Sequence, residues 1–255
     1  MIGGLSSSVG IKPPKRRSRP KGEKALNFDG TDDYVEISDF TYATTGDFTI
    51  SFWVNRNTSW DENNTGLFAQ SANKSNTFYI GTLLTGVNSG RLALFAAVGG
   101  SNTIDLRTTD HDMSTNTWYH VAAVVDRSSA SNSKFYIDGE PVSMNTQTIA
   151  DTTTSIDQSA NMRIGNNSAS ASYFRAAFKD FMIHSAALSQ KHIKKIFQHK
   201  GRKRLLSTPQ IKNNLELYLP LGDGTEAGSG STVYDMSGNG RNGTITGAQF
   251  LNWVY

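Results

Sequence analysis

The chain has 255 residues, which is long enough for one large domain to bury a substantial hydrophobic core. Hydrophobic residues make up 37% of it, and no apolar run approaches the roughly 20 residues of a membrane-spanning helix. The chain has no cysteine, which excludes disulfides and thiolate metal sites, and its formal net charge is +3.

The charges are unevenly distributed along the chain. Residues 12–24 contain seven basic side chains and one acid, and residues 191–204 contain seven basic side chains and no acid. The remainder of the chain therefore carries a net charge of −10. This distribution predicts an acidic body with two basic segments.

Residues 1–24 are rich in Gly, Ser, Pro and basic residues, a composition that predicts a flexible arm outside the core. The arm does not resemble a Sec signal peptide, because it lacks a charged leading region followed by an apolar stretch of about 7–15 residues. We expect its apolar and basic side chains to anchor the protein to a partner. These are Ile2, Leu5, Val9, Ile11, Lys15, Arg16, Arg17, Arg19 and Lys21.

Short strands are predicted from Ala25 onward. Residues 25–37 predict two strands joined by a turn at Asp29-Gly30. Residues 47–56 predict another strand, because their apolar side chains fall on one face and the intervening ones on the other. Further strands are predicted at 67–70, 77–81, 91–97, 103–108, 162–165 and 177–184. Many short strands with regular turn signals favour a sandwich or jelly roll over alternating βαβ units.

The fold is expected to be built around a hairpin over residues 117–142. Residues 118–125 are apolar on both faces, so this strand is predicted to be covered on both sides. Its partner strand begins at Phe135 and ends at a tight turn at Asp138-Gly139. The predicted core includes Phe52, Trp118, Val121, Val125, Phe135 and Ile137.

One short helix is predicted at 189–200, since Ile193, Ile196 and Phe197 form an apolar stripe at helical spacing. Residues 211–255 then return to β structure. We expect this closing segment to complete the same sandwich and to bring the C-terminal strand near Ala25.

Several motifs resemble those of one known family. They are ALNFDGTDDYV at 25–35, WYHVAAVVD at 118–126 followed by FYIDG at 135–139, FKDFMIHSAALS at 178–189, and DMSGNG at 235–240. In this order they resemble the laminin-G-like branch of the concanavalin A-like jelly rolls, over residues 25–255. The resemblance implies an all-β sandwich of two antiparallel sheets as one domain, preceded by the arm at 1–24.

The fold also occurs in glycoside hydrolases, which need a pair of suitably spaced carboxylates. Of the six glutamates, only Glu36 has another acid four residues away, Asp32, and the Glu-x-Asp-x-Glu pattern of the hydrolase relatives is absent. His120 lies in a strand pattern typical of a packed residue, and the other histidines lack metal-ligand spacing. We therefore expect no enzyme activity.

Calcium is the one metal that the sequence supports, because hard oxygen donors suit Ca²⁺ and the resemblance implies that relatives often bind it. Asp29, Asp32 and Asp33 offer carboxylates in one turn, and Asp180 or Asp235 could join them once the terminal strands meet. The alternative is that these acids only shape turns.

Trp60 lies in the polar loop NTSWDENNTG and is a candidate for stacking on a sugar, although such a residue also packs its own loop on the sandwich. The basic segments could contact the phosphates of a nucleic acid. No aromatic residue interleaves the arm, however, so a nucleic acid is not the expected partner.

The leading functional hypothesis is a non-enzymatic structural or adhesion protein of a virion surface, such as a phage decoration or fibre-associated component. The arm would anchor it to capsid or tail proteins in a multi-copy assembly, without a membrane span or a Sec signal. The first alternative is a carbohydrate-binding lectin for host-cell or extracellular glycans. The second is an intracellular assembly protein that uses the arm on nucleic acid.

Overall fold

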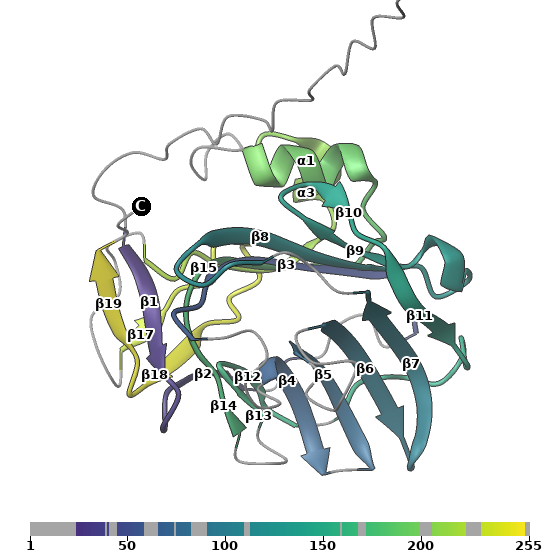
Figure 1. Ribbon diagram of the computed structural model, residues 1–255, viewed down its shortest axis with the longest axis horizontal. Coiled ribbons are helices and arrows are strands. Elements are labelled where there is room, and N and C mark those ends of the chain that lie inside the picture. The colour runs from purple at the N-terminus through teal and green to yellow at the C-terminus, as the bar shows by residue number, and fades with distance from the viewer. Residues whose placement is uncertain are drawn as a thin grey trace, which may run out of the picture.

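The computed structural model describes residues 24–38, 40, 45–58, 66–73, 75–82, 91–109, 113–158, 160–167, 172–198, 206–222 and 231–252. Two antiparallel sheets face each other and enclose the core (Figure 1). A small two-stranded sheet of β13 (Asn166–Asn167) and β14 (Ser172–Tyr173) is separate from both. The predicted all-β sandwich is confirmed.

The first sheet has eight strands in the order β10-β9-β8-β3-β15-β1-β19, with β16 also paired to β15. Its strands are β1 (Lys24–Asp29), β3 (Phe48–Asn55), β8 (Trp118–Val125), β9 (Lys134–Ile137), β10 (Glu140–Pro141), β15 (Arg175–His184), β16 (Leu215–Leu219) and β19 (Gln249–Asn252). Lys24, which the sequence placed in the arm, is the first residue of β1. Ala25 pairs with Leu251 of β19, so the C-terminal strand lies beside the first strand, as predicted.

The second sheet has nine strands in the order β11-β7-β6-β5-β4-β12-β2-β18-β17. They are β2 (Tyr34–Ile37), β4 (Gly66–Asn73), β5 (Asn76–Thr82), β6 (Leu92–Val98), β7 (Ser101–Thr108), β11 (Met144–Ile149), β12 (Met162–Ile164), β17 (Thr232–Val233) and β18 (Gly243–Thr246). Each of the strand ranges predicted from the sequence between residues 25 and 108 and between 162 and 184 overlaps an observed strand.

The main core lies between the two sheets and is rich in aromatic side chains. Phe52 stacks on Phe181 of the same sheet at 6.0 Å between ring centroids. Phe68 of the second sheet packs on the same Phe181 ring at 5.3 Å. Rings from the inner faces of both sheets therefore close the sandwich.

The strand β8 is buried along its whole length, as its two apolar faces predict. Its inner side chains Val121 and Val125 belong to the main core. Trp118 was expected there as well, but it lies in a small separate cluster with Ala25. The reason is the two-residue period of a strand, which places Trp118 on the face opposite to that of Tyr119 and Val121.

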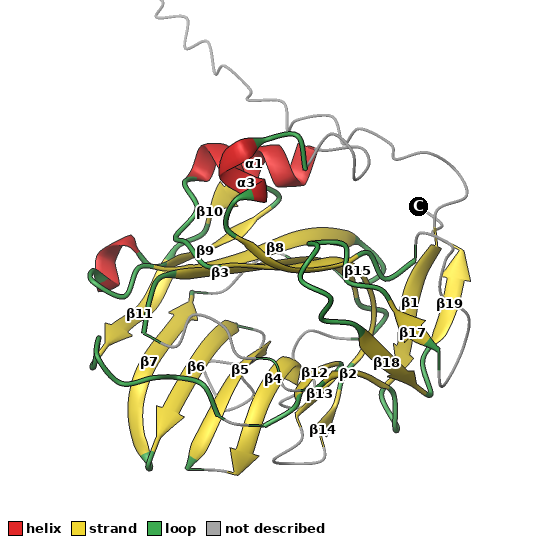
Figure 2. Ribbon diagram, turned by 180° about the vertical axis from the view of Figure 1, so that it is seen from behind, coloured by secondary structure: helices red, strands yellow, loops and turns green. Residues whose placement is uncertain are grey.

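Two helices cover the outer face of the first sheet (Figures 1 and 2). Helix α1 (Gln190–Gln198) lies within the predicted 189–200 and buries Ile193 and Ile196. Helix α3 (Pro209–Lys212) was not predicted and replaces β structure at the start of the segment assigned to 211–255. Pro209 suits the first turn of a helix, and Ile211 holds this turn against the sheet.

A short 3₁₀ helix, η2 (Ala130–Asn132), occupies the loop between β8 and β9. No helix among the described residues is long and apolar enough to cross a membrane.

Candidate functional site

The outer face of the nine-stranded sheet carries no α-helix within the described residues (Figure 2). One cross-strand row of side chains runs over this whole face, because register pairs its members strand by strand. In sheet order it consists of Thr148, Asp105, Phe95, Tyr79, Ala69, Arg163, Glu36, Thr244 and Thr232.

Tyr79 and Phe95 form an aromatic pair in the middle of this row. Their ring centroids lie 5.7 Å apart with an interplanar angle of 37°, and both side chains are partly exposed. On one side of this pair, the next residues on the same face are Gly81, two residues after Tyr79, and Ala93, two residues before Phe95. The two rings therefore project from a floor of small residues.

Beside the aromatic pair, Arg107 and Asp105 form a bidentate ion pair. The Nε of Arg107 donates to Oδ1 of Asp105 at 2.7 Å and Nη2 donates to Oδ2 at 2.6 Å. The hydrogen bond to Asp105 raises the pKa of Arg107 above its usual value. The pKa of the Tyr79 hydroxyl is raised chiefly by burial and, to a smaller extent, by Asp105, although Arg107 opposes the shift. Tyr79 therefore remains a neutral hydrogen-bonding group near physiological pH.

A second ion pair lies on the other side of Ala69 in the row. Nε and Nη2 of Arg163 both approach Oε2 of Glu36 at 2.7 Å. Arg163 also stacks on the Tyr34 ring at 4.3 Å and donates to Oδ1 of Asn166 at 3.2 Å. Glu36 and Asp105 are thus both held by guanidinium groups.

The three aspartates predicted to bind calcium do come together in the turn between β1 and β2. One carboxylate oxygen from each of Asp29, Asp32 and Asp33 lies within 4.8 Å of the others. Two oxygens at the usual 2.3–2.6 Å from one Ca²⁺ ion lie up to about 5 Å apart, so this spacing fits the ion. The carboxylates also shape the turn. The backbone N–H of Asp29 donates to Oδ2 of Asp33 at 2.6 Å, and that of Thr31 donates to Oδ1 of Asp29 at 2.7 Å.

The environment of Asp33 shifts the pKa of its carboxyl group. Its side chain is buried, and desolvation raises its pKa, with the nearby charges of Asp29 and Asp32 acting in the same direction and the Asp29 backbone N–H opposing them. Gly247, with a φ of +69°, closes over the cluster from the turn between β18 and β19. A Cβ at Gly247 would overlap Oδ1 of Asp33, so the site admits only glycine there.

Asp180 and Asp235 do not join this cluster, contrary to the expectation from sequence. Oδ1 of Asp180 accepts a hydrogen bond from the Tyr218 hydroxyl at 2.9 Å. Asp235 instead accepts four hydrogen bonds, among them those from the backbone N–H groups of Tyr218 at 3.0 Å and Arg241 at 3.1 Å.

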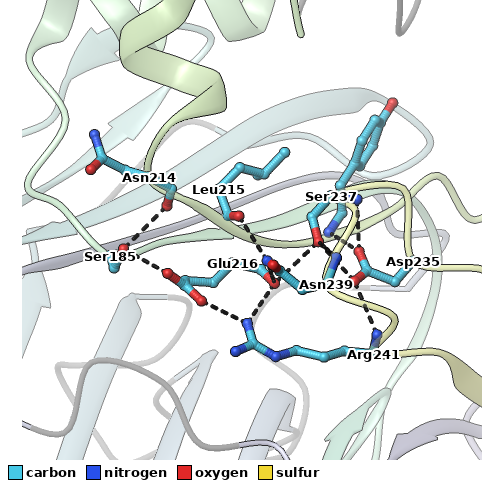
Figure 3. A network of polar contacts seen from close by, with 9 residues as sticks. Ser185, Asn214, Leu215, Glu216, Asp235, Ser237, Asn239 and Arg241 are labelled. Atoms are coloured by element: carbon cyan, nitrogen blue, oxygen red, sulfur yellow. Dashed lines mark hydrogen bonds and ion pairs between the residues drawn. The ribbon is translucent and has the colours of Figure 1, made fainter.

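The loop that contains Asp235 closes on β16 through further polar contacts (Figure 3). Arg241 Nη1 donates to the carbonyl oxygen and to Oε2 of Glu216, both at 2.7 Å, and Asn239 Nδ2 donates to the carbonyl oxygens of Leu215 at 3.1 Å and Glu216 at 3.0 Å. The motif DMSGNG therefore has a structural role, since its loop is hydrogen-bonded to β16.

The basic segment at 191–204 is described only as far as Gln198. Lys194 pairs with Glu140 of β10 at 2.8 Å, and Gln190 donates to the same carboxylate at 2.9 Å. Trp60 and the nine anchoring residues of the arm lie outside the described residues.

Sequence reasoning did not single out Tyr79, Phe95, Asp105 or Arg107. A signal was present, since Phe78-Tyr79 and Leu94-Phe95 each place a large apolar side chain on both faces of a strand. Only cross-strand register brings the two outer rings together.

Comparison with known proteins supports this fold. A model of the concanavalin A-like lectin/glucanases superfamily matches residues 29–194. No curated protein sequence matches the chain.

Among solved structures, a candidate carbohydrate-binding protein from Bacteroides ovatus superposes with a TM-score of 0.65 at 21% identity, covering 92% of this chain. This chain spans 61% of the length of that protein. Domain 4 of an extracellular GH43 arabinanase from Geobacillus stearothermophilus, in complex with arabinotriose, gives a TM-score of 0.50 at 18% identity, covering 68% of this chain and 76% of its own. The binding domain of botulinum neurotoxin serotype G gives a TM-score of 0.51 at 14% identity. The match covers 71% of this chain and 46% of the neurotoxin domain.

Proposed function

Because the chain belongs to the concanavalin A-like lectin/glucanases superfamily, we propose that it is a carbohydrate-binding module whose site is the outer sheet face around Tyr79 and Phe95. The observation that carries the proposal is this partly exposed aromatic pair beside the Arg107–Asp105 pair. A sugar ring presents apolar C–H faces that stack on aromatic rings, and its hydroxyls need fixed donors and acceptors around them. The site offers both kinds of group.

The same face supports binding without catalysis. A glycosidase requires one carboxyl group that donates a proton and a second that acts as nucleophile or base. The carboxylates of Asp105 and Glu36 are each engaged by an arginine guanidinium, so neither is oriented toward a substrate as an acid or a nucleophile. We therefore propose a non-enzymatic role.

The test is glycan binding by the wild type and by Tyr79→Ala. Loss of the ring should weaken binding about tenfold, which corresponds to about 1.4 kcal/mol and matches the energy of an aromatic stack. Tyr234→Ala is the matched control, because Tyr234 is 50% exposed and follows β17 at the far edge of the same sheet. Isothermal titration with a glycan identified on an array measures both. Equal affinity of wild type and Tyr79→Ala would move the site elsewhere.

We also propose that Asp29, Asp32 and Asp33 hold a Ca²⁺ ion. The spacing of their oxygens supports it, as does the raised pKa of Asp33, which is caused chiefly by burial and to a smaller extent by the charges of Asp29 and Asp32. The ion would fix the turn between β1 and β2 and, through Gly247, the turn between β18 and β19.

The setting that we propose is a virion surface or the extracellular space, with the arm attached to other virion proteins in a multi-copy assembly. Support comes from the sequence of the arm, in which apolar residues precede a basic run that is spaced by proline. Proline keeps such a segment extended and lowers the entropy lost on docking.

A further inference from the structure

Four charged groups on the proposed sugar-binding face form two ion pairs. The cross-strand row and its neighbour contain two guanidinium groups, Arg107 and Arg163, and two carboxylates, Asp105 and Glu36. Each guanidinium donates through Nε and Nη2 to its carboxylate at 2.6–2.7 Å. These two pairs therefore supply strong hydrogen-bonding groups without adding net charge to the face.

The Arg107–Asp105 pair is held rigidly. Both carboxylate oxygens of Asp105 are engaged by the two nitrogens of one guanidinium, a geometry that fixes orientation as well as distance. The side chain of Asp105 is only 13% exposed, against 32% for Arg107. Asp105 therefore cannot turn its charge to solvent when Arg107 meets a ligand.

We propose that this site selects uncharged sugars and that Asp105 determines the selectivity by neutralising Arg107. The inference rests on the proposed carbohydrate binding. A carboxylate or sulfate on the ligand could form a bidentate pair with Nε and Nη2 of Arg107 only by displacing Asp105, which already holds both nitrogens. It would also meet the charge of Asp105, and like charges repel strongly where they are partly shielded from water.

An uncharged sugar encounters no such penalty. The ion pair uses Nε and Nη2 of Arg107, which leaves Nη1 to donate to a ligand, and the Asp105 oxygens keep acceptor capacity. The Tyr79 hydroxyl adds a group that can both donate and accept. Neighbouring sugar hydroxyls, which also donate and accept, match a donor and an acceptor fixed side by side on the strand next to Phe95.

The test compares neutral with uronate- or sialate-bearing oligosaccharides on one glycan array, using the wild type and Asp105→Asn. The wild type should bind neutral members at least tenfold more tightly than acidic ones. Asn cannot neutralise Arg107, so Asp105→Asn should raise the affinity for acidic members about tenfold and lose the discrimination. Glu36→Gln is the control. It removes the carboxylate of the second ion pair, but Arg163 remains engaged by Tyr34 and Asn166. Its discrimination should remain that of the wild type.

A second variant, Arg107→Gln, keeps the inference testable if Asp105→Asn folds poorly, and it should reject acidic sugars at least as strongly as the wild type. Preference of the wild type for acidic glycans, or a gain of acidic binding in Arg107→Gln, would overturn the selectivity and leave the carbohydrate-binding function standing. Absence of binding to both classes would overturn that function and this inference with it.

Discussion

At the scale of single residues, His184 is a buried group whose environment strongly changes its pKa. It lies at the end of β15 with no exposed surface, and neither ring nitrogen has a hydrogen-bond partner within the described part of the chain. Burial lowers its pKa from 6.5 to about 4, with Glu216 opposing the shift and His192 adding to it. His184 is therefore neutral in the native protein at physiological pH.

This shift predicts a loss of stability in acid. The folded pKa lies below the unfolded value, so the contribution of His184 is fully present above pH 6.5 and is lost as the pH falls toward about 4. The loss is on the order of 3 kcal/mol. Urea unfolding at pH 7 and pH 4.5 measures it, and His184→Leu should reduce the difference between the two. An unchanged difference would assign the acid sensitivity to other groups, such as Glu216, which faces His184.

At the scale of elements, the turn between β1 and β2 meets the turn between β18 and β19 at the aspartate cluster. Burial and, to a smaller extent, the repulsion of Asp29 and Asp32 raise the pKa of Asp33 in this junction. A bound ion would remove that repulsion and join two pairs of strands that are far apart in sequence.

The calcium proposal predicts a chelator-sensitive melting temperature. At a hundredfold excess of free Ca²⁺ over Kd the ion adds about 2.7 kcal/mol to the unfolding free energy, so chelation should lower the Tm. Asp32→Asn should abolish this response, since it removes one ligand without touching the hydrogen bonds of Asp29 and Asp33. Asp126→Asn, in a turn stabilised by Ser128, is the control and should leave the response intact. If chelation leaves the wild-type Tm unchanged, the aspartates only make the turn.

At the scale of the whole molecule, the sandwich depends on one continuous core between its sheets. Val125 has no exposed surface and lies in this core on β8, which pairs with both β3 and β9. A charge at this position would have neither water nor a partner.

Val125→Asp should therefore unfold the protein, because an unpaired buried charge costs several kcal/mol or more. Leu251→Asp is the matched control, since Leu251 is 50% exposed and should accept the charge. Circular dichroism and thermal melting distinguish the two. A soluble variant with native melting at Val125→Asp would contradict the assigned core.

The arm is predicted to contribute to attachment and not to stability. Deletion of residues 1–23 keeps β1 intact from Lys24 and should leave the Tm nearly unchanged. The truncated protein should no longer co-purify with particles, and replacement of the five basic residues alone should remove only the salt-sensitive part of attachment. Full occupancy of particles by the truncated protein would remove the anchoring hypothesis and favour a free lectin.

The sequence by itself determined the strands, the fold class and the main helix. Alternation of apolar side chains in β3 and on both faces of β8 follows from the two-residue period of a strand, and the stripe of Ile193 and Ile196 follows from the helical period. These patterns are local, so they can be recognised without knowing what lies opposite. The aspartates of the β1–β2 turn could be grouped for the same reason, since they are neighbours in the chain.

Only the tertiary structure decided which distant side chains meet. Register places Phe95 of β6 beside Tyr79 of β5, and it brings Arg163 to Glu36 across more than a hundred residues of chain. The fold also places Asp235 where it accepts a hydrogen bond from Tyr218 of β16, away from the aspartate cluster. Alternation tells which face a side chain takes, but its neighbours on that face depend on strand order and register, which the packing of the whole sandwich decides.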